Sequence, residues 1–155
     1  MTSVVRIGPA GALSAEEFRA LRSLVGLMIP ASSEYEVPGA DDASILRDIA
    51  SSLGRDHAAV RQALQHLNDL TGGAFAEAPD EMRETVTQRF RDAHPLLAAV
   101  LVAVTTRCYY RDDRVMRALG MEPRPPFPKG FEVEQGDWSL LDPVRERGKI
   151  YRDTP

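Results

Sequence analysis

The sequence predicts an all-α protein: a compact bundle of about five to six helices followed by an extended, proline-rich C-terminal tail. Between residues 14 and 120, apolar residues recur every three or four positions, the period of a helix with one buried face. Capping residues open these runs, and proline or glycine closes them. After residue 120 the period is lost, and four of the eight residues from 121 to 128 are proline. We therefore expect an N-terminal extension at 1–13, a helical domain at 14–120 and a tail at 121–155.

The first helix is predicted to start at Ser14, whose hydroxyl can cap the first turn while Glu17 reaches back to close a capping box. Pro30 ends this helix, and the loop that follows contains the turn dipeptide Pro38-Gly39. The apolar face of the helix comprises Phe18, Leu21, Leu24, Val25 and Met28. This face is expected to lie in the core.

Two further helices are predicted between residues 42 and 73. The first runs from about 42 to 53, and two alternatives exist for its inward face: Ile45, Ile49 and Leu53, or Leu46, Ile49 and Leu53. Asp56 is the predicted N-cap of the next helix, and Gly72-Gly73 ends it. The apolar face of that helix comprises Val60, Leu64, Leu67 and Leu70.

The second half of the domain contains a helix of a different kind. A fourth amphipathic helix opens at residues 78–81 and carries the apolar face Met82, Val86 and Phe90. Residues 96–104 are then apolar on every side, which predicts a central core helix surrounded by the amphipathic helices. Asp112 caps a last short helix that ends at Leu119-Gly120.

Composition narrows the class of protein. The net charge of -4 argues against general nucleic-acid binding, which needs clustered basic residues. The longest apolar run has nine residues, too few to span a bilayer. Residues 1–13 hold no apolar stretch of signal-peptide length, so the chain as encoded is expected to be cytoplasmic, and periplasmic only if a partner's signal exports it or a signal has been removed. The single cysteine, Cys108, excludes an intrachain disulfide and disfavours a cysteine zinc site.

The residues that could carry chemistry do not form a known catalytic or metal-binding pattern. His57 and His66 lie nine residues apart on one predicted helix, on opposite sides of it, and His94 is on another segment. The acidic pairs at 41–42 and 112–113 precede predicted helices, where carboxylates act as caps. Cys108 is interpreted as a buried structural cysteine. We therefore predict no catalytic, cofactor-binding or metal-binding residue in this chain.

Aromatic and apolar residues near the C-terminal end are the candidate recognition residues. Tyrosine and tryptophan bury much area with few rotors and keep a polar group, which favours them at interfaces. The predicted partner-binding residues are Tyr109, Tyr110, Phe127, Phe131, Trp138, Leu140, Leu141 and Tyr151. For the two tyrosines, core packing remains an equal alternative.

Two stretches resemble a known family. The segment EFRALRSLVGLMIPA at residues 17–31, followed by VPGADDA at residues 37–43 and a short helix, resembles the family of gluconate 2-dehydrogenase subunit 3. In that family a helix ends in an Ile-Pro-Ala-like turn, and a Pro-Gly-Ala stretch leads into the next helix. The layout of the C-terminal part is also similar, with Tyr109-Tyr110, Leu119-Gly120, the prolines at 123–126 and a late Trp138. The likeness spans most of the chain through short motifs.

The resemblance implies a small subunit without a cofactor of its own. Its partner would be a large FAD-dependent oxidoreductase of the glucose-methanol-choline type, which oxidises sugars, sugar acids or related alcohols and holds both the flavin and the catalytic histidine. A cytochrome c is the implied electron acceptor. Many family members carry a twin-arginine export signal, and this sequence departs from that pattern because it has no twin arginine.

Two other classes of function compete with the accessory subunit. One is a free-standing homo-oligomeric helical binding protein without a flavoprotein partner. The other is a small enzyme that uses Asp41, Asp42, His57 or His94, for which the sequence offers no convergent spacing.

Overall fold

A computed structural model of the chain describes residues 12–125, 127–132, 134–149 and 152. The chain divides between Pro123 and Arg124 into two compact units, close to the boundary expected after residue 120. Most of the expected N-terminal extension, residues 1–11, lies outside the described residues.

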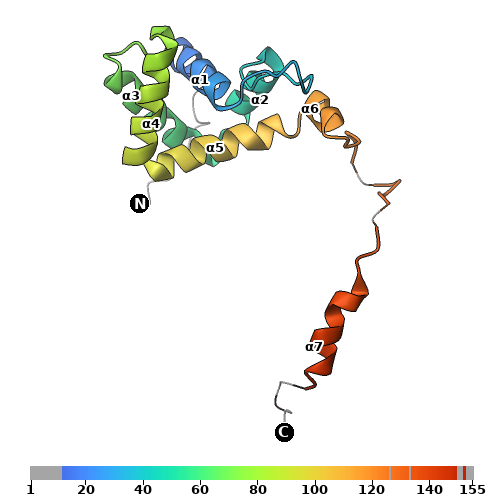
Figure 1. Cartoon of the computed structure of the whole chain (residues 1–155). Coiled ribbons are helices and arrows are strands. Elements are labelled where there is room, and N and C mark those ends of the chain that lie inside the picture. Colours follow the sequence, from blue (N-terminus) through green and yellow to red (C-terminus); the bar gives the residue numbers. More distant parts are fainter. Residues whose placement is uncertain (1–11, 126, 133, 150–151, 153–155) are drawn as a thin grey trace, which may run out of the picture. The chain divides into compact units, whose positions relative to one another are not determined.

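The first unit is built from α-helices (Figure 1). These are α1 (Ala15–Met28), α2 (Ala43–Ser51), α3 (His57–Leu70), α4 (Asp80–Ala93), α5 (Pro95–Tyr109) and α6 (Asp113–Ala118). Short 3-10 helices precede α3 and α4, namely η1 (Gly54–Asp56) and η2 (Phe75–Glu77). No strand occurs among the described residues, whose only β-type pairing is an isolated bridge between Ser32 and Val37. The all-α prediction is confirmed.

Ser14 caps α1 as the sequence predicts. Its hydroxyl accepts a hydrogen bond from the Glu17 amide at 3.1 Å, and the Glu17 carboxylate accepts one from the Ser14 amide at 2.7 Å. Arg61 of α3 donates to the other Glu17 oxygen at 2.6 Å, which ties the start of α1 to α3. Of the predicted apolar face, Leu21, Leu24 and Val25 are buried, whereas Phe18 is 37% exposed and Met28 is half-buried.

The predicted apolar faces of the second and third helices are buried except for Leu70, which is 41% exposed, and the expected cap of the third helix is absent. Both alternatives for the inward face of α2 hold, because the core takes Ile45, Leu46, Ile49 and Leu53 together. Asp56 does not cap α3. The 3-10 helix η1 runs directly into α3, so Asp56 has helical dihedral angles and its side chain accepts no capping hydrogen bond. Its carboxylate lies instead 3.8 Å from the Arg107 guanidinium of α5.

Two glycines end α3 and turn the chain back over the core. Gly72 and Gly73 have positive φ angles of 70° and 96°, and the Gly73 amide donates to the Asn68 carbonyl at 2.7 Å. This turn brings η2 against α1, with Phe75 fully buried. The Phe75 amide donates to the Asn68 side-chain oxygen at 3.3 Å. Phe75 was not among the predicted core residues.

The expectation of a central α5 is wrong. α5 packs against α2, α3 and α4 along one side only, and it spans one side of the first unit (Figure 1). Leu96 is 83% exposed and Val102 is 50% exposed. Met82 of α4 is likewise about half exposed, so that predicted face retains only Val86 and Phe90 in the core. A run of apolar residues shows only that the run lacks polar residues. It does not show that neighbouring elements cover every side of the helix.

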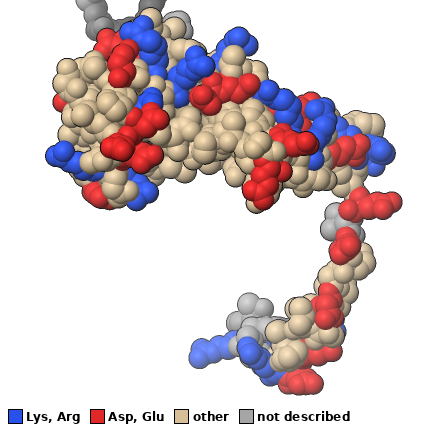
Figure 2. All heavy atoms as spheres, turned by 45° about the horizontal axis from the view of Figure 1, so that its top comes forward, with Lys and Arg blue, Asp and Glu red and all other residues tan. Residues whose placement is uncertain are grey.

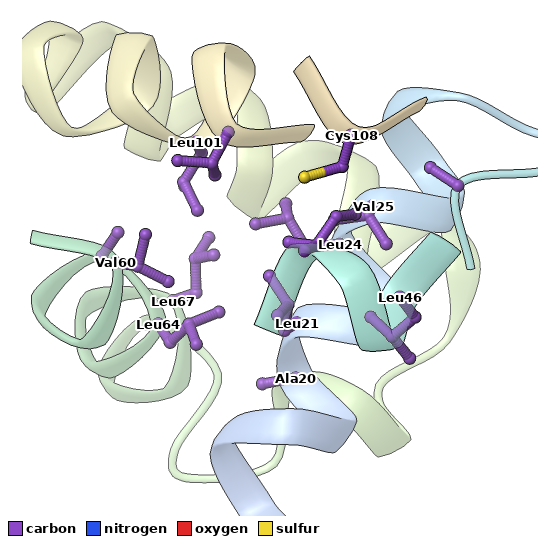
Figure 3. Packing of buried hydrophobic residues seen from close by; sticks show 14 of the residues in the cluster. Ala20, Leu21, Leu24, Val25, Leu46, Val60, Leu64, Leu67, Leu101 and Cys108 are labelled. Atoms are coloured by element: carbon purple, nitrogen blue, oxygen red, sulfur yellow. The ribbon is translucent and has the colours of Figure 1, made fainter. Parts of the chain in front are cut away.

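The core fills the space between α1, α3 and the inner side of α5. Figure 3 shows Leu21 and Leu24 of α1 and Leu64 and Leu67 of α3 pointing into the same interior, with Leu101 of α5 above them. Cys108 lies in this core with 1% of its surface exposed. The expectation that Cys108 is buried is therefore confirmed.

The second unit contains a short helical segment, and the prediction of an extended tail is wrong over this segment. A 3-10 helix, η3 (Trp138–Leu141), continues into α7 (Asp142–Glu146). Asp137 caps the segment by accepting hydrogen bonds from the Ser139 amide at 3.0 Å and the Ser139 hydroxyl at 2.6 Å. Pro143 occupies the first turn of α7, where its missing N–H carries no cost. These local interactions stabilise a short helix. The sequence pattern did not predict it, because that prediction relied on apolar residues that recur over several helical turns.

Candidate functional site

The two motifs that carry the family resemblance lie side by side. The Ala40 amide donates to the Ile29 carbonyl at 2.9 Å, and Ser32 and Val37 exchange backbone hydrogen bonds at 3.0 and 3.1 Å. The Tyr109 hydroxyl of α5 donates to the Pro38 carbonyl at 3.0 Å. Residues 29–42 therefore form a compact loop that closes on the end of α1 and is fastened to α5.

Gly39 lies at the tightest point of this loop. A Cβ atom there would stand 2.9 Å from the Ala31 backbone nitrogen and 2.4 Å from an Asp41 carboxylate oxygen. The carboxylate could move, but the Ala31 backbone could move only with the whole loop. The requirement for glycine is therefore steric rather than conformational.

We expect Gly39→Ala to lower the free energy of unfolding by roughly 1–3 kcal/mol, because the added methyl overpacks the loop. Urea unfolding followed by circular dichroism measures this change. The control is Gly136→Ala, since a Cβ at Gly136 would meet no atom within 4 Å. Equal midpoints for Gly39→Ala and the wild type would show that the loop opens without cost.

The two tyrosines are separated by the structure. Tyr109 is only 4% exposed, so this predicted partner-binding residue belongs to the core and to the loop clamp. Tyr110 is 54% exposed and meets the Tyr109 ring edge-on at 5.3 Å between centroids. Only Tyr110 therefore stays available to a partner.

Arg114 of α6 joins two capping aspartates. It donates to Asp42, the N-cap of α2, at 2.8 Å and to Asp112, the N-cap of α6, at 3.0 Å. These hydrogen bonds hold the pKa of both carboxyl groups below the usual range, with the Ser44 hydroxyl contributing at Asp42. The two carboxylates thus act as helix caps, as predicted, and also bind one guanidinium between them. Figure 2 shows the alternating basic and acidic side chains at the α6 end of the first unit.

We expect Arg114→Gln to lower the free energy of unfolding by about 1 kcal/mol at pH 7, a modest value because the pair is partly solvated. A lowered carboxyl pKa stabilises the fold fully above the ordinary value near 3.9 and loses that contribution as the pH falls through the folded-state value. The difference between wild type and variant should therefore narrow below about pH 4. Urea unfolding at pH 7 and pH 3 measures it, with the more exposed Arg117→Gln as the control. A difference that stays constant between these pH values would contradict the ion-pair account.

A shallow polar pocket beside this network contains the only cysteine. Arg111 forms hydrogen bonds and an ion pair with Asp48, and also donates to the Ser52 hydroxyl at 2.6 Å. Burial, together with the charge of Asp48, raises the pKa of the Cys108 thiol. The thiol therefore stays protonated at neutral pH, where a nucleophile would need to ionise.

The structure brings together two histidines that the sequence separates. The rings of His66 on α3 and His94 between α4 and α5 stack with centroids 4.2 Å apart. His94 also lies 5.5 Å from the Phe90 ring, so the pair covers one edge of the core. His57 opens α3, and its Nε2 is buried without a hydrogen-bond partner. No group of three or more His, Cys, Asp or Glu side chains within the described residues is arranged to hold a metal ion.

An apolar groove runs between α1, α4 and α5. It encloses about 540 Å³. Its walls include Leu27 and Met28 from the end of α1, Phe90 from α4 and Val102 from α5. The polar residues along it are Glu84, Thr87, Gln88, Arg91 and Thr106, and the Thr87 hydroxyl oxygen is buried there without a hydrogen-bond partner.

The exposed side of α5 continues this groove. We define the α5 outer face as Leu96, Ala99, Val102 and Ala103, all of which are exposed. No charged residue occurs between positions 95 and 106, and the polar side chain that borders the end of the face is Thr106, since Thr105 is buried. An uncharged helix face beside an apolar groove is an unusual surface for a free domain and is typical of an interaction site. Sequence reasoning missed this surface because it placed α5 in the centre.

The predicted tail residues lie on an accessible segment. The exposed fractions are 84% for Phe127, 50% for Phe131, 62% for Trp138, 74% for Leu140 and 41% for Leu141. Phe131 is partly covered, since the Arg124 guanidinium lies 4.3 Å from its ring centre. Tyr151, the last of the predicted contacts, lies outside the described residues.

No protein-family model, curated protein or solved structure matches this chain. Within the described residues, no helix is long and apolar enough to cross a bilayer, as the sequence predicts.

Proposed function

We propose that this chain is a non-catalytic small subunit that binds and stabilises a large FAD-dependent oxidoreductase acting on sugars, sugar acids or related alcohols. The α5 outer face carries the proposal that the chain binds a larger protein. Leu96 and Val102 keep half or more of their surface in water, where each costs free energy that a partner would recover. The groove beside them extends the same surface across α4 and α1.

The flavoprotein partner is inferred from the resemblance to gluconate 2-dehydrogenase subunit 3. The motifs behind that resemblance have a common physical role, because the Ile29-Pro30-Ala31 turn and the Pro38-Gly39-Ala40 stretch pair with each other. In this proposal the partner supplies the flavin and the catalytic residues, and a cytochrome c accepts electrons from it. The small subunit contributes apolar surface that keeps the large one folded.

The test is co-purification from the native host. An affinity-tagged copy of the full chain is expected to retain a larger polypeptide that releases FAD on denaturation, in about equal molar amount. Deletion of the chain should lower the soluble level of that polypeptide. An eluate that contains the tagged chain but no flavin would refute the proposal.

A homo-oligomeric binding protein is the second candidate. The α5 outer face supports this second candidate, because an uncharged face with two alanines also suits packing against a second copy of the chain. Light scattering of the isolated chain separates the two, because the mass of one chain is 17.1 kDa. A stable dimer without any flavoprotein would favour this second function.

A further inference from the structure

The helical segment of the second unit is formed by its own residues. Asp137 caps its start, Pro143 occupies the first turn of α7, and Arg145 pairs with Asp142 at 3.0 Å near its end. No residue of this segment is buried. A segment that is already helical loses less conformational entropy when it binds than a flexible one does.

The apolar side chains of this segment are largely exposed. Trp138, Leu140 and Val144 each keep more than half of their surface exposed, and Leu141 keeps 41%. Trp138, Leu141 and Val144 are spaced by three residues, so they lie on one side of the short helical segment. Leu140 borders this side, because it precedes Val144 by four residues. We call these four residues the tail anchor. Phe131 is left out, because Arg124 already lies over its ring.

Charge changes sign along the segment. Residues 130–144 hold Glu132, Glu134, Asp137 and Asp142 and no basic residue, whereas residues 145–152 hold four basic residues against one acidic. Figure 2 shows acidic side chains along the second unit and, toward its end, basic side chains with acidic ones beside them. The helix dipole accounts for acidic residues in the first turn and basic ones in the last. It does not account for Glu132 and Glu134, which precede the cap, or for Lys149 and Arg152, which follow the helix, since the effect fades within one turn.

We propose, on the basis of the proposed function, that the tail anchor docks in one orientation into an apolar cleft of the flavoprotein. The cleft would have basic residues at the end that receives Glu132 and Glu134, and acidic residues at the end that receives Arg147 and Lys149. The anchor supplies affinity through buried apolar area, and the two charge blocks fix the direction of docking. A reversed segment would place like charges together at both ends.

A membrane surface does not fit this pattern. An anionic bilayer would attract the basic block and repel the acidic block next to the anchor. A protein cleft can complement both signs within one short segment. The alternation of charge therefore favours a protein as the occupant.

The test uses the full-length tagged chain in its native host and measures the flavin retained per mole of chain. We expect Trp138→Ala/Leu141→Ala to reduce capture about tenfold. Glu132→Lys/Glu134→Lys and Arg147→Glu/Lys149→Glu should each reduce it roughly threefold, and less at high salt. Matched controls lie in the first unit: Tyr35→Ala removes an aromatic ring that is 67% exposed, and Glu34→Lys/Glu36→Lys reverses two exposed charges at the same spacing. The controls should capture as the wild type does.

Each outcome assigns the failure to one proposal. Flavin capture that is undiminished in every tail variant would overturn tail docking and leave the accessory-subunit function standing. Absence of flavin with the wild-type chain would overturn both. Sedimentation of the isolated chain with phosphatidylglycerol vesicles, strengthened by Glu132→Lys/Glu134→Lys, would assign the tail to a membrane and also overturn the proposal.

Trp138 allows a second readout, because it is the only tryptophan in the chain. Labelled with fluorotryptophan, the free chain should give one fluorine resonance at a solvent-exposed shift. That resonance should move and broaden on addition of the purified flavoprotein. An unchanged resonance in a complex that still retains flavin would place Trp138 outside the interface.

Discussion

Replacement of Phe75 by alanine is expected to lower the free energy of unfolding by about 3–5 kcal/mol, the usual cost of removing a buried aromatic ring. Phe75 is fully buried, and it stands in a short 3-10 helix with no long element to hold it. The buried ring is the main apolar contact that joins η2 to α1 and α3, beside the hydrogen bond of the Phe75 amide to Asn68 and the ion pair between Arg19 and Glu77. Its loss should leave a cavity at the junction and release the connection between α3 and α4.

Thermal unfolding measured by calorimetry gives the test, with an expected fall in Tm of roughly 10–20 °C. Phe18→Ala is the matched control, because Phe18 is 37% exposed on α1. It should cost about 1–2 kcal/mol, since part of its ring already lies in water. Equal losses for the two variants would contradict the view that η2 is held by Phe75.

Phe75 also shows where local sequence signals stop. The glycine pair before it and the Pro79 that follows mark helix ends correctly, so helix bounds could be predicted. Whether a lone aromatic ring between two helix ends turns inward depends on the shape of the space below it. No periodic pattern exists over so short a segment, so its burial could not be predicted.

The misplacement of α5 has a related cause. The sequence pattern of an amphipathic helix predicts which side faces water, as it does for α1 and α3. The pattern of a helix without polar residues does not show which side faces water. Which side is exposed depends on how many neighbouring elements pack against the helix. The same ambiguity hides an interaction surface, because the residues of a core and of an interface are alike.

Contacts between residues far apart in the chain also could not be predicted from the sequence. The Tyr109 hydroxyl binds the Pro38 carbonyl across 71 positions, and the stacked His66 and His94 come from different helical segments. Capping could be predicted because it joins residues two or three apart, as at Ser14 and Asp112. The prediction of a cap failed at Asp56, because residues 54–56 form a 3-10 helix that runs directly into α3.

The largest functional effect is expected from a charge on the α5 outer face. Ala103→Glu should weaken the retention of the flavoprotein at least about 30-fold, because an interface would bury the carboxylate without a partner at a cost of about 2 kcal/mol or more. Ala103 is exposed in the first unit, so the same change should alter its stability by no more than about 0.5 kcal/mol. This contrast separates a binding role from a structural one.

Ala58→Glu is the matched control, since Ala58 is an exposed alanine on α3, away from the groove residues. It should retain as much flavin as the wild type. Retention by Ala103→Glu at the wild-type level would mean that the α5 outer face stays in water in the complex, and docking through the tail anchor would then have to supply the affinity. Loss with Ala103→Glu and loss with Trp138→Ala/Leu141→Ala would mean instead that the two units bind the same partner. The second contact then forms at a high effective concentration, because the first already holds the chain there.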